Sequence, residues 1–275
     1  MKHRIFRPSS LGIWLLLIVL TLLCVVPFLV VFVNSTHSSL DIVTKFHLLP
    51  GDALAENYQT MQKLVDIWRG FFNSIAITIP FTLLTGYFGA FTAYGFAKYK
   101  FRFQNVLYAI VLASMMIPSQ LSIIGFYRLC LKLGLTNSYL PFIIPGIANA
   151  TTVFFLRGMI EQSISDSMIE APRIEGCSEF GIFNRIVLPC IMPGVATMCI
   201  FNFVASWNAY MGPLIILQRK ELYTMPVMIS MIKGLYVTNY GAMYLAVAIS
   251  VIPIMIVFAI FSRYIIDGLT AGSEK

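Results

Sequence analysis

Apolar residues occur in six long runs that contain no Asp, Glu, Lys or Arg, and the charged residues lie between the runs. A helix needs about 20 consecutive apolar residues to cross roughly 30 Å of hydrocarbon. Because the runs are continuously apolar and do not alternate, they predict helices and not the strands of a barrel. The expected spans are residues 11–33, 71–97, 103–127, 138–156, 191–217 and 241–261.

Two of these runs raise a question of interpretation. The fourth is the least regular, since it holds Pro141, Pro145 and Gly146, and such breakers are tolerated in lipid when neighbouring helices satisfy the freed backbone groups. The first follows basic residues, as a signal peptide would. We expect a retained helix, because the run has 23 residues and no small-x-small cleavage site follows it.

Two of the longer polar segments also show helical patterns. Between the first two runs, residues 53–68 have apolar positions at spacings of three and four, which predicts an amphipathic helix that lies on the membrane or faces an external partner. Residues 218–240 are moderately apolar and contain Met225, Met228 and Met231. Methionine surfaces adapt to partners, and a short re-entrant or interfacial helix is an equal alternative.

The connection at residues 157–190 is the most polar stretch between spans. Its Ser167-x-x-Glu170 pattern predicts the start of a short helix, and Gly176 permits a turn that other residues avoid. Helical spacing then resumes with Phe180 and Phe183 on one side, before Pro189. The pattern predicts a helix, a turn and a second helix with an aromatic face. That face either meets a partner or packs back onto the chain's own helices.

Composition and charge support a membrane protein. The chain is 58% hydrophobic and 11% charged, whereas soluble domains are about 45–50% apolar and about a quarter charged. With the N-terminus inside, eleven basic residues fall on the inner side and eight on the outer, and the cluster at 98–102 lies in the shortest loop. Basic residues favour the cytoplasmic side. Both termini and the connection are therefore expected in the cytoplasm, and the net charge of +7 reflects topology and not nucleic-acid binding.

The residues needed for several other chemistries are missing from the sequence. The three histidines lie outside the runs, and neither H-E-x-x-H nor G-x-S-x-G occurs, which argues against a membrane enzyme. No acidic residue lies in a run, which argues against an ion-coupled transporter. Five cysteines without a C-x-x-C spacing support neither a disulfide framework nor a metal site. The phosphate loop G-x-x-x-x-G-K-[ST] is also missing, so an ATPase activity is not expected in this chain.

The connection resembles the EAA loop found in the membrane subunits of binding-protein-dependent ABC importers. That motif reads E-A-A-x-x-x-G, then about nine residues, then I-x-L-P, and it is matched here by Glu170, Ala171, Gly176, Ile186, Leu188 and Pro189. Pro172 stands where the motif has its second alanine, and Glu175 where an aspartate is usual. The stretches NSIAITIP (73–80), AYGFAKYKF (93–101), MMIP (115–118), LGLTNSY (133–139), FVASWNAYMGPLIIL (203–217) and GLTAGSEK (268–275) are similar to the carbohydrate-uptake, MalG-like branch.

The resemblance implies an all-α membrane protein with six transmembrane helices, the type I ABC importer permease fold and both termini in the cytoplasm. It implies an N-terminal helix and outer segment at 1–70, a permease core at 71–263 that contains the connection, and a cytoplasmic tail at 264–275. The expected partners are a MalF-like second permease subunit, dimeric ATP-binding subunits and an extracytoplasmic solute-binding protein. No cofactor is expected, because the ATPase subunits bind ATP. The expected place is a bacterial cytoplasmic membrane, and the solute is a sugar or oligosaccharide, or alternatively a polyol or glycerol phosphate.

Two sets of residues are expected to carry the function. By resemblance, the connection docks into a cleft of the ATPase: Glu170 faces a basic residue, Gly176 makes the turn, Phe180 and Phe183 enter the cleft, and Ala171, Leu188 and Pro189 complete the motif. A solute path would be lined by uncharged polar and aromatic groups inside the runs. The candidates are Asn73, Asn202, Trp207, Asn208 and Tyr210, which suit a neutral sugar. The alternative for the asparagines is that they bridge helices by hydrogen bonds.

Overall fold

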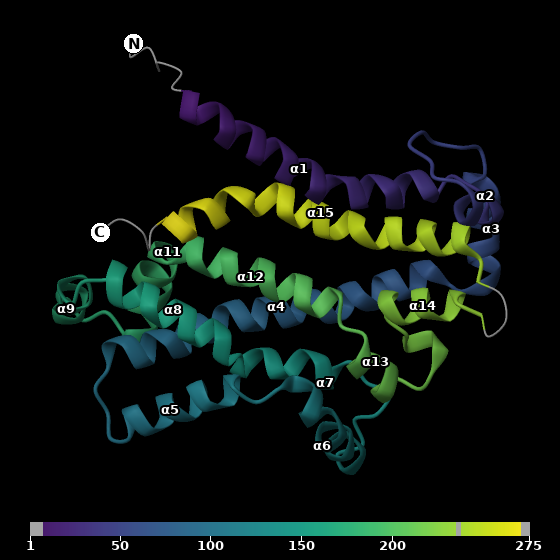
Figure 1. Ribbon diagram of the computed structural model, residues 1–275. Coiled ribbons are helices and arrows are strands. Elements are labelled where there is room, and N and C mark those ends of the chain that lie inside the picture. The colour runs from purple at the N-terminus through teal and green to yellow at the C-terminus, as the bar shows by residue number, and fades with distance from the viewer. Residues whose placement is uncertain (1–7, 235–237, 271–275) are drawn as a thin grey trace. The chain divides into compact units, whose positions relative to one another are not determined.

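The computed structural model describes residues 8–234 and 238–270, most of which are helical (Figure 1). The first half of the chain forms α1 (Pro8–Asn34), α2 (Ser39–Thr44), α3 (Leu54–Leu64), α4 (Ile67–Lys98), α5 (Gln104–Met115) and α6 (Ser119–Lys132). The second half forms α7 (Leu140–Ile143), a 3-10 helix (Ile144–Ala148), α8 (Ala150–Ser163), α9 (Ser167–Ile174), α10 (Glu179–Ile182), a π-helix (Phe183–Val187), α11 (Leu188–Cys190), α12 (Met192–Trp207), α13 (Met211–Ile216), a 3-10 turn (Lys220–Leu222), α14 (Met225–Ile232) and α15 (Tyr240–Thr270).

The expected spans divide into four long helices and two broken ones. Helical segments that are long and apolar enough to cross a membrane are Gly12–Asn34, Ile67–Lys98, Leu140–Ser163 and Tyr240–Tyr264. The run at 103–127 is not one straight helix, because α5 and α6 meet at a bend of 105° beside Pro118. The run at 191–217 also differs from the expectation: α12 ends at Trp207, and a bend of 79° separates it from Glu179–Cys190. The described part of the chain thus has four candidate spans, or six if each bent pair is counted as one.

The fourth run is irregular, as its prolines and glycine predicted. Pro145 and Gly146 lie in the 3-10 helix, and α8 then begins after Asn149, whose side chain accepts a hydrogen bond from the Thr152 backbone N–H at 2.9 Å. This cap satisfies one of the backbone donors that every helix start leaves free. The amphipathic helix expected at 53–68 is shorter than predicted, since α3 ends at Leu64 and α4 begins at Ile67.

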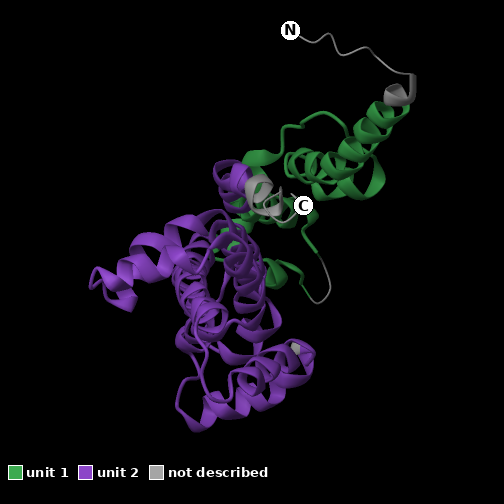
Figure 2. Cartoon of the chain, turned by 90° about the vertical axis from the view of Figure 1, so that its left-hand side faces the viewer, with its two compact units in different colours: residues 1–67, 228–252 green, residues 68–227, 253–275 purple. Residues whose placement is uncertain are grey.

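The chain forms two compact units, which Figure 2 shows in different colours. Unit 1 contains Met1–Ile67 and Met228–Ile252, and unit 2 contains Trp68–Val227 and Pro253–Lys275. In unit 1, Asn57 of α3 donates to the carbonyl oxygens of Ser35 and His37, both at 2.9 Å. Gly241 makes room for this contact, because a Cβ there would overlap the Asn57 side chain.

The hydrophobic core of unit 2 lies where α4, α8 and α12 pack with the connection between α8 and α12. It includes Ala90 and Tyr94 of α4, Leu156 of α8 and Val195 of α12. The helices approach closely at Gly194, where a Cβ would collide with the Met159 side chain. Small residues at such crossings are typical of helices packed in membranes, where backbone proximity maximises van der Waals contact.

Candidate functional site

The connection between α8 and α12 lies at one end of unit 2, where Figure 1 places α9 and α11. The last two turns of α8 extend into the expected range of 157–190, since this helix ends at Ser163. The predicted helix starts at Ser167 as expected, but without the capping box. Its N-cap is Asp166, whose carboxylate instead binds the Lys98 ammonium group at 2.8 Å. That hydrogen bond lowers the pKa of Asp166 and ties the start of α9 to the end of α4.

The turn after α9 forms as the sequence predicts. Gly176 has φ +85°, in the left-handed region that favours glycine. The Cys177 N–H donates to the Pro172 carbonyl at 3.0 Å, and the Gly176 N–H donates to the Arg173 carbonyl at 3.1 Å. These two bonds are the Schellman arrangement that ends many helices. The helix continues past Pro172 to Ile174, and the Pro172 carbonyl then serves the cap. Ser178 next caps α10 by accepting from Gly181 N–H at 3.2 Å.

Phe183 packs against the chain's own helices. Its side chain is fully buried, with ring centroids 5.7 Å from Tyr87, 5.0 Å from Phe91 and 5.8 Å from Tyr94, all on α4. The expectation that Phe183 enters an ATPase cleft is therefore wrong, and the alternative of packing back onto the helices applies to this residue. An aromatic residue in such a cluster contributes both its buried area and the ring contacts. Phe183 consequently anchors the connection to α4.

A polar network anchors the connection a second time. The Arg173 guanidinium binds the Glu179 carboxylate at 2.7 Å, and the Tyr99 hydroxyl donates to the same carboxylate. The hydroxyls of Tyr99 and Tyr94 are hydrogen-bonded at 3.1 Å. Arg173 and then Tyr99 lower the pKa of Glu179, because both stabilise its ionised form. The sequence did not reveal this network, since Tyr99 and Glu179 are 80 residues apart along the chain.

The outer face of the connection exposes the other motif residues. Glu170, Ala171, Gly176 and Pro189 are exposed, and Leu188 is half-buried against the core. Phe180 is 60% exposed, and Ile174 is 87% exposed. Ile174 escaped the sequence analysis, although an apolar residue directly before a helix-ending Glu-Gly pair was a visible signal. We call Glu170, Ile174 and Phe180 the docking face, because exposed apolar groups beside a charge are typical of a partner surface.

A charged hollow of about 320 Å³ borders the docking face. Its lining comes from the end of α4, the loop that follows, the first residue of α5, the last turns of α8 and one side of α9. Glu170 and Arg173 are among the lining residues, together with Lys98, Lys100 and Arg157. The hollow thus brings basic side chains and the acidic Glu161, Asp166 and Glu170 together at this end of unit 2.

Two of the solute-path candidates are buried in packed helices. The Asn202 amide donates to Thr152 Oγ1 at 3.0 Å and to the Met198 carbonyl at 2.7 Å, and its oxygen accepts from Asn149 Nδ2 at 3.1 Å. Asn202 thus bridges α12 to the start of α8, as the alternative interpretation predicted. Trp207 is fully buried, and its ring stacks on Phe203 at 5.9 Å. The expectation that these two side chains line a path is corrected.

The other three candidates lie elsewhere. The Asn73 amide donates to the carbonyl oxygens of Glu221 and Tyr223, at 2.9 and 3.0 Å, and so holds the segment before α14. Asn208 is exposed at the end of α12, and Tyr210 is partly exposed just beyond it. Both hydrogen bonds that the Asn73 side-chain amide donates therefore go to backbone carbonyls and not to Asn208 or Tyr210.

A hollow of about 230 Å³ lies next to these candidates within unit 2. Its lining residues are Ser74, Ile77, Thr78, Phe81, Phe142, Ala205, Ser206, Ala209, Pro213 and Thr224. Ser206 donates to Thr78 Oγ1 at 3.2 Å, whereas the buried Thr224 Oγ1 has no hydrogen-bond partner among the described residues. All of these side chains are uncharged, so the hollow can accept a neutral, hydroxyl-bearing group but offers no partner for an anion.

Three comparisons with known proteins agree with one another. Residues 85–270 match the model of a family described as binding-protein-dependent transport system inner membrane component. The chain is 34% identical over 208 residues to the arabinooligosaccharides transport system permease protein AraQ of Bacillus subtilis strain 168, across 76% of this chain and 74% of that protein. It is 30% identical over 272 residues to the multiple sugar-binding transport system permease protein MsmG of Streptococcus mutans serotype c, across 95% and 96% of the two chains.

A solved structure shares the fold. It is a chain of a bacterial ABC transporter involved in the import of the acidic polysaccharide alginate, with a TM-score of 0.81 and 22% sequence identity. The match covers 95% of this chain and 99% of that one. The expected type I importer permease fold therefore has a direct structural counterpart.

Proposed function

Because the chain belongs to the family of binding-protein-dependent transport system inner membrane components, we propose that it is the permease subunit of an importer for a sugar or oligosaccharide. Chains of this family are transport components and not enzymes, and a separate subunit hydrolyses ATP. The names of the relatives support a sugar as the solute, since they include arabinooligosaccharides and multiple sugars. The uncharged lining of the 230 Å³ hollow favours a neutral solute over glycerol phosphate.

The proposed topology has six spans, with each bent helix pair counted as one. The N-terminus and the connection lie in the cytoplasm of a bacterial cell, with eleven basic residues on that side and eight on the other. Residues 1–70 form the first span and outer segment, 71–263 the permease core, and 264–275 a cytoplasmic tail. The last five residues of that tail, 271–275, lie outside the described residues.

The docking face is proposed to bind the ATPase. The observation that supports this most strongly is the fixation of the connection to α4 by Phe183 and by the Glu179 network, while Ile174 and Phe180 stay exposed. A segment that is rigidly joined to a span can transmit the movement of a motor to that span, which alternating access requires. A second permease subunit and an external solute-binding protein complete the proposed assembly.

Ile174→Asp tests the docking face, and Ile174→Leu is its matched control. Because Ile174 is 87% exposed, the aspartate disturbs no core contact, and we expect the permease to keep its thermal stability. We expect Ile174→Asp to lose the ATPase subunit during purification and to lose uptake, whereas Ile174→Leu keeps both. Normal uptake by Ile174→Asp with the ATPase bound would refute the docking face.

The solute is tested separately, with the unmodified transporter and its binding protein in liposomes. We expect uptake of labelled oligosaccharides when ATP is supplied to the ATPase side. Uptake of a polyol or of glycerol phosphate, and of no sugar in the panel, would overturn the sugar assignment and leave the docking face standing.

A further inference from the structure

The segment that follows α1 exposes an unusual amount of apolar surface. We call residues 38–50 the apolar loop; it contains α2 and the chain after it. Five of its large apolar side chains are 66–78% exposed, namely Leu40, Val43, Phe46, Leu48 and Leu49. Single exposed apolar residues are common, but a cluster of this size on an extramembrane segment indicates a surface that meets another apolar phase.

The apolar loop is held in shape at its base. The Gly51 N–H donates to Thr36 Oγ1 at 2.7 Å, and the Ala53 N–H donates to the Thr36 carbonyl at 2.8 Å. The His37 ring hydrogen-bonds the Leu49 carbonyl at 2.9 Å and stacks on His47, with centroids 3.7 Å apart. These contacts hold the backbone of the loop in one conformation, and that conformation keeps its apolar side chains exposed.

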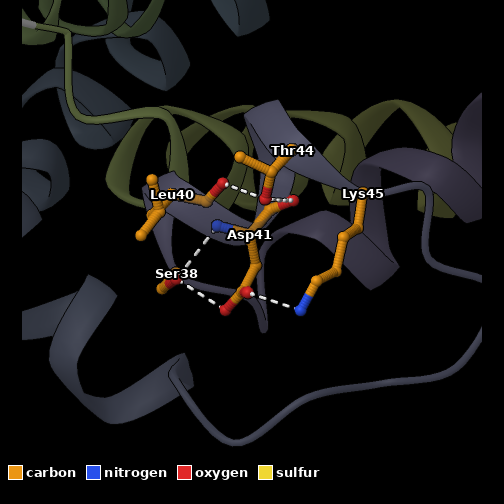
Figure 3. A network of polar contacts seen from close by, with 5 residues as sticks. All are labelled: Ser38, Leu40, Asp41, Thr44 and Lys45. Carbon is orange, nitrogen blue, oxygen red and sulfur yellow. Dashed lines mark hydrogen bonds and ion pairs between the residues drawn. The ribbon is translucent and has the colours of Figure 1, made fainter.

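The charges of the apolar loop are neutralised within it. Asp41 and Lys45 form an ion pair at 3.7 Å, and the Ser38 hydroxyl donates to Asp41 at 2.7 Å, as Figure 3 shows. The Ser38 hydrogen bond, more than the charge of Lys45, lowers the pKa of Asp41 and keeps it ionised for this pair. Thr44 Oγ1 donates to the Leu40 carbonyl at 2.8 Å. Satisfied polar groups of this kind reduce the cost of moving α2 out of bulk water.

The covalent position of the apolar loop identifies its partner. α1 has 27 residues, which is about 40 Å of helix at 1.5 Å per residue, close to the thickness of a bilayer with its headgroups. The apolar side chains of α1 are exposed from Ile13 to Leu29, as a lipid-facing span requires. The apolar loop begins four residues after α1 ends at Asn34, so it lies at the level where the bilayer meets water.

We propose that the apolar loop inserts its five exposed apolar side chains into the bilayer–water interface at the C-terminal end of α1. The residue types favour lipid over a protein partner, because the exposed set has four aliphatic residues, one Phe and neither Trp, Tyr nor Arg, which dominate protein hot spots. Amphipathic segments of this kind lie in the interface with their apolar face in the acyl boundary. The insertion fixes the depth of α1, and it depends neither on the solute nor on the docking face.

Spin labels in the complete transporter test this proposal. Single cysteines replace Phe46 or Leu48 in a variant whose five native cysteines are substituted and whose uptake is retained. The control is Glu56→Cys, at an exposed position of α3. A nitroxide label is attached at each position, and the transporter is placed in phospholipid nanodiscs. The accessibility of each label is measured from its collisions with oxygen, which concentrates in lipid, and with a water-soluble nickel chelate. We expect oxygen to broaden the signals at 46 and 48 several-fold more than nickel, and the reverse order at 56.

The other outcomes overturn the proposal in distinguishable ways. Greater access of nickel than of oxygen at 46 and 48 would place the apolar loop in water. A strongly immobilised label that neither reagent reaches would place it under the second permease subunit. Loss of access only when the solute-binding protein is added would make the apolar loop a docking surface for that protein.

Discussion

Phe180 and Phe183 lie three residues apart, and truncating each to alanine removes the same atoms with opposite consequences. Phe183 is fully buried among three aromatic rings of α4, whereas Phe180 is 60% exposed and has the ring of Phe91 at 6.2 Å. Phe183→Ala therefore leaves a cavity in the core, at a typical cost of about 3–5 kcal/mol in the free energy of unfolding. Phe180→Ala removes a side chain that is about two-fifths buried, which corresponds to about 1 kcal/mol.

The two variants separate stability from docking. We expect Phe183→Ala to lower the thermal unfolding midpoint of the detergent-solubilised permease clearly, and Phe180→Ala to leave it nearly unchanged. In the assembled transporter, Phe180→Ala is expected to weaken retention of the ATPase, because the docking face loses one of its two apolar side chains. Phe183→Leu, which refills part of the cavity, serves as the control for Phe183→Ala and should recover most of the midpoint.

Two results would refute this reasoning. If both alanine variants lowered the midpoint equally, Phe180 would be as much a part of the core as Phe183. If Phe183→Ala released the ATPase while the permease kept its midpoint, Phe183 would contact the motor directly, and its packing on α4 would not describe the assembled protein.

Three further predictions follow from other contacts. Gly176 has φ +85° and open space where a Cβ would lie, so only backbone strain opposes its substitution. Gly176→Asn should retain coupled ATP hydrolysis, whereas Gly176→Val, strained by about 1–2 kcal/mol, should lower its rate. Equal rates in the two variants would argue that the left-handed turn is not required for coupling. Asn202→Leu removes the acceptor of Asn149 Nδ2 and one of the two hydrogen bonds of Thr152 Oγ1, so the unfolding free energy should fall by about 1–3 kcal/mol while the KM for uptake stays constant. A changed KM would return Asn202 to the solute path. Lys98 lowers the pKa of Asp166 below 3.8, so this ion pair stabilises the folded protein above pH 3.8, and the stabilisation is lost as the pH falls through the lower pKa of the folded state. Asp166→Asn should remove this part of the acid dependence of the unfolding midpoint. An unchanged pH profile would contradict the pairing.

The amino-acid sequence by itself determined the membrane-protein class, the position of the four long candidate spans and the motif of the connection. These features are local: a run of about 20 apolar residues needs lipid whatever its neighbours are, and Gly176 permits a left-handed turn in any context. The proline-rich fourth run was predicted to be irregular for the same reason, since proline removes a backbone donor at its own position. The bend of 105° beside Pro118 was not predicted, because a single proline does not reveal whether a helix breaks there: α4 continues through Pro80.

Only the tertiary structure decided which side chains are available to a partner. Helical periodicity placed Phe180 and Phe183 on one face, but contact with Phe91 and Tyr94, about 90 residues earlier in the chain, buries one and leaves the other exposed. Asn202 looked equally suited to binding a solute or bridging helices until its amide was found with Asn149 and Thr152. The exposure of Ile174 and of the apolar loop likewise follows from the packing of the chain around them. Whether a helix face is buried depends on which distant segments pack against it. A sequence pattern shows which residues share a helix face, but it does not show what covers that face.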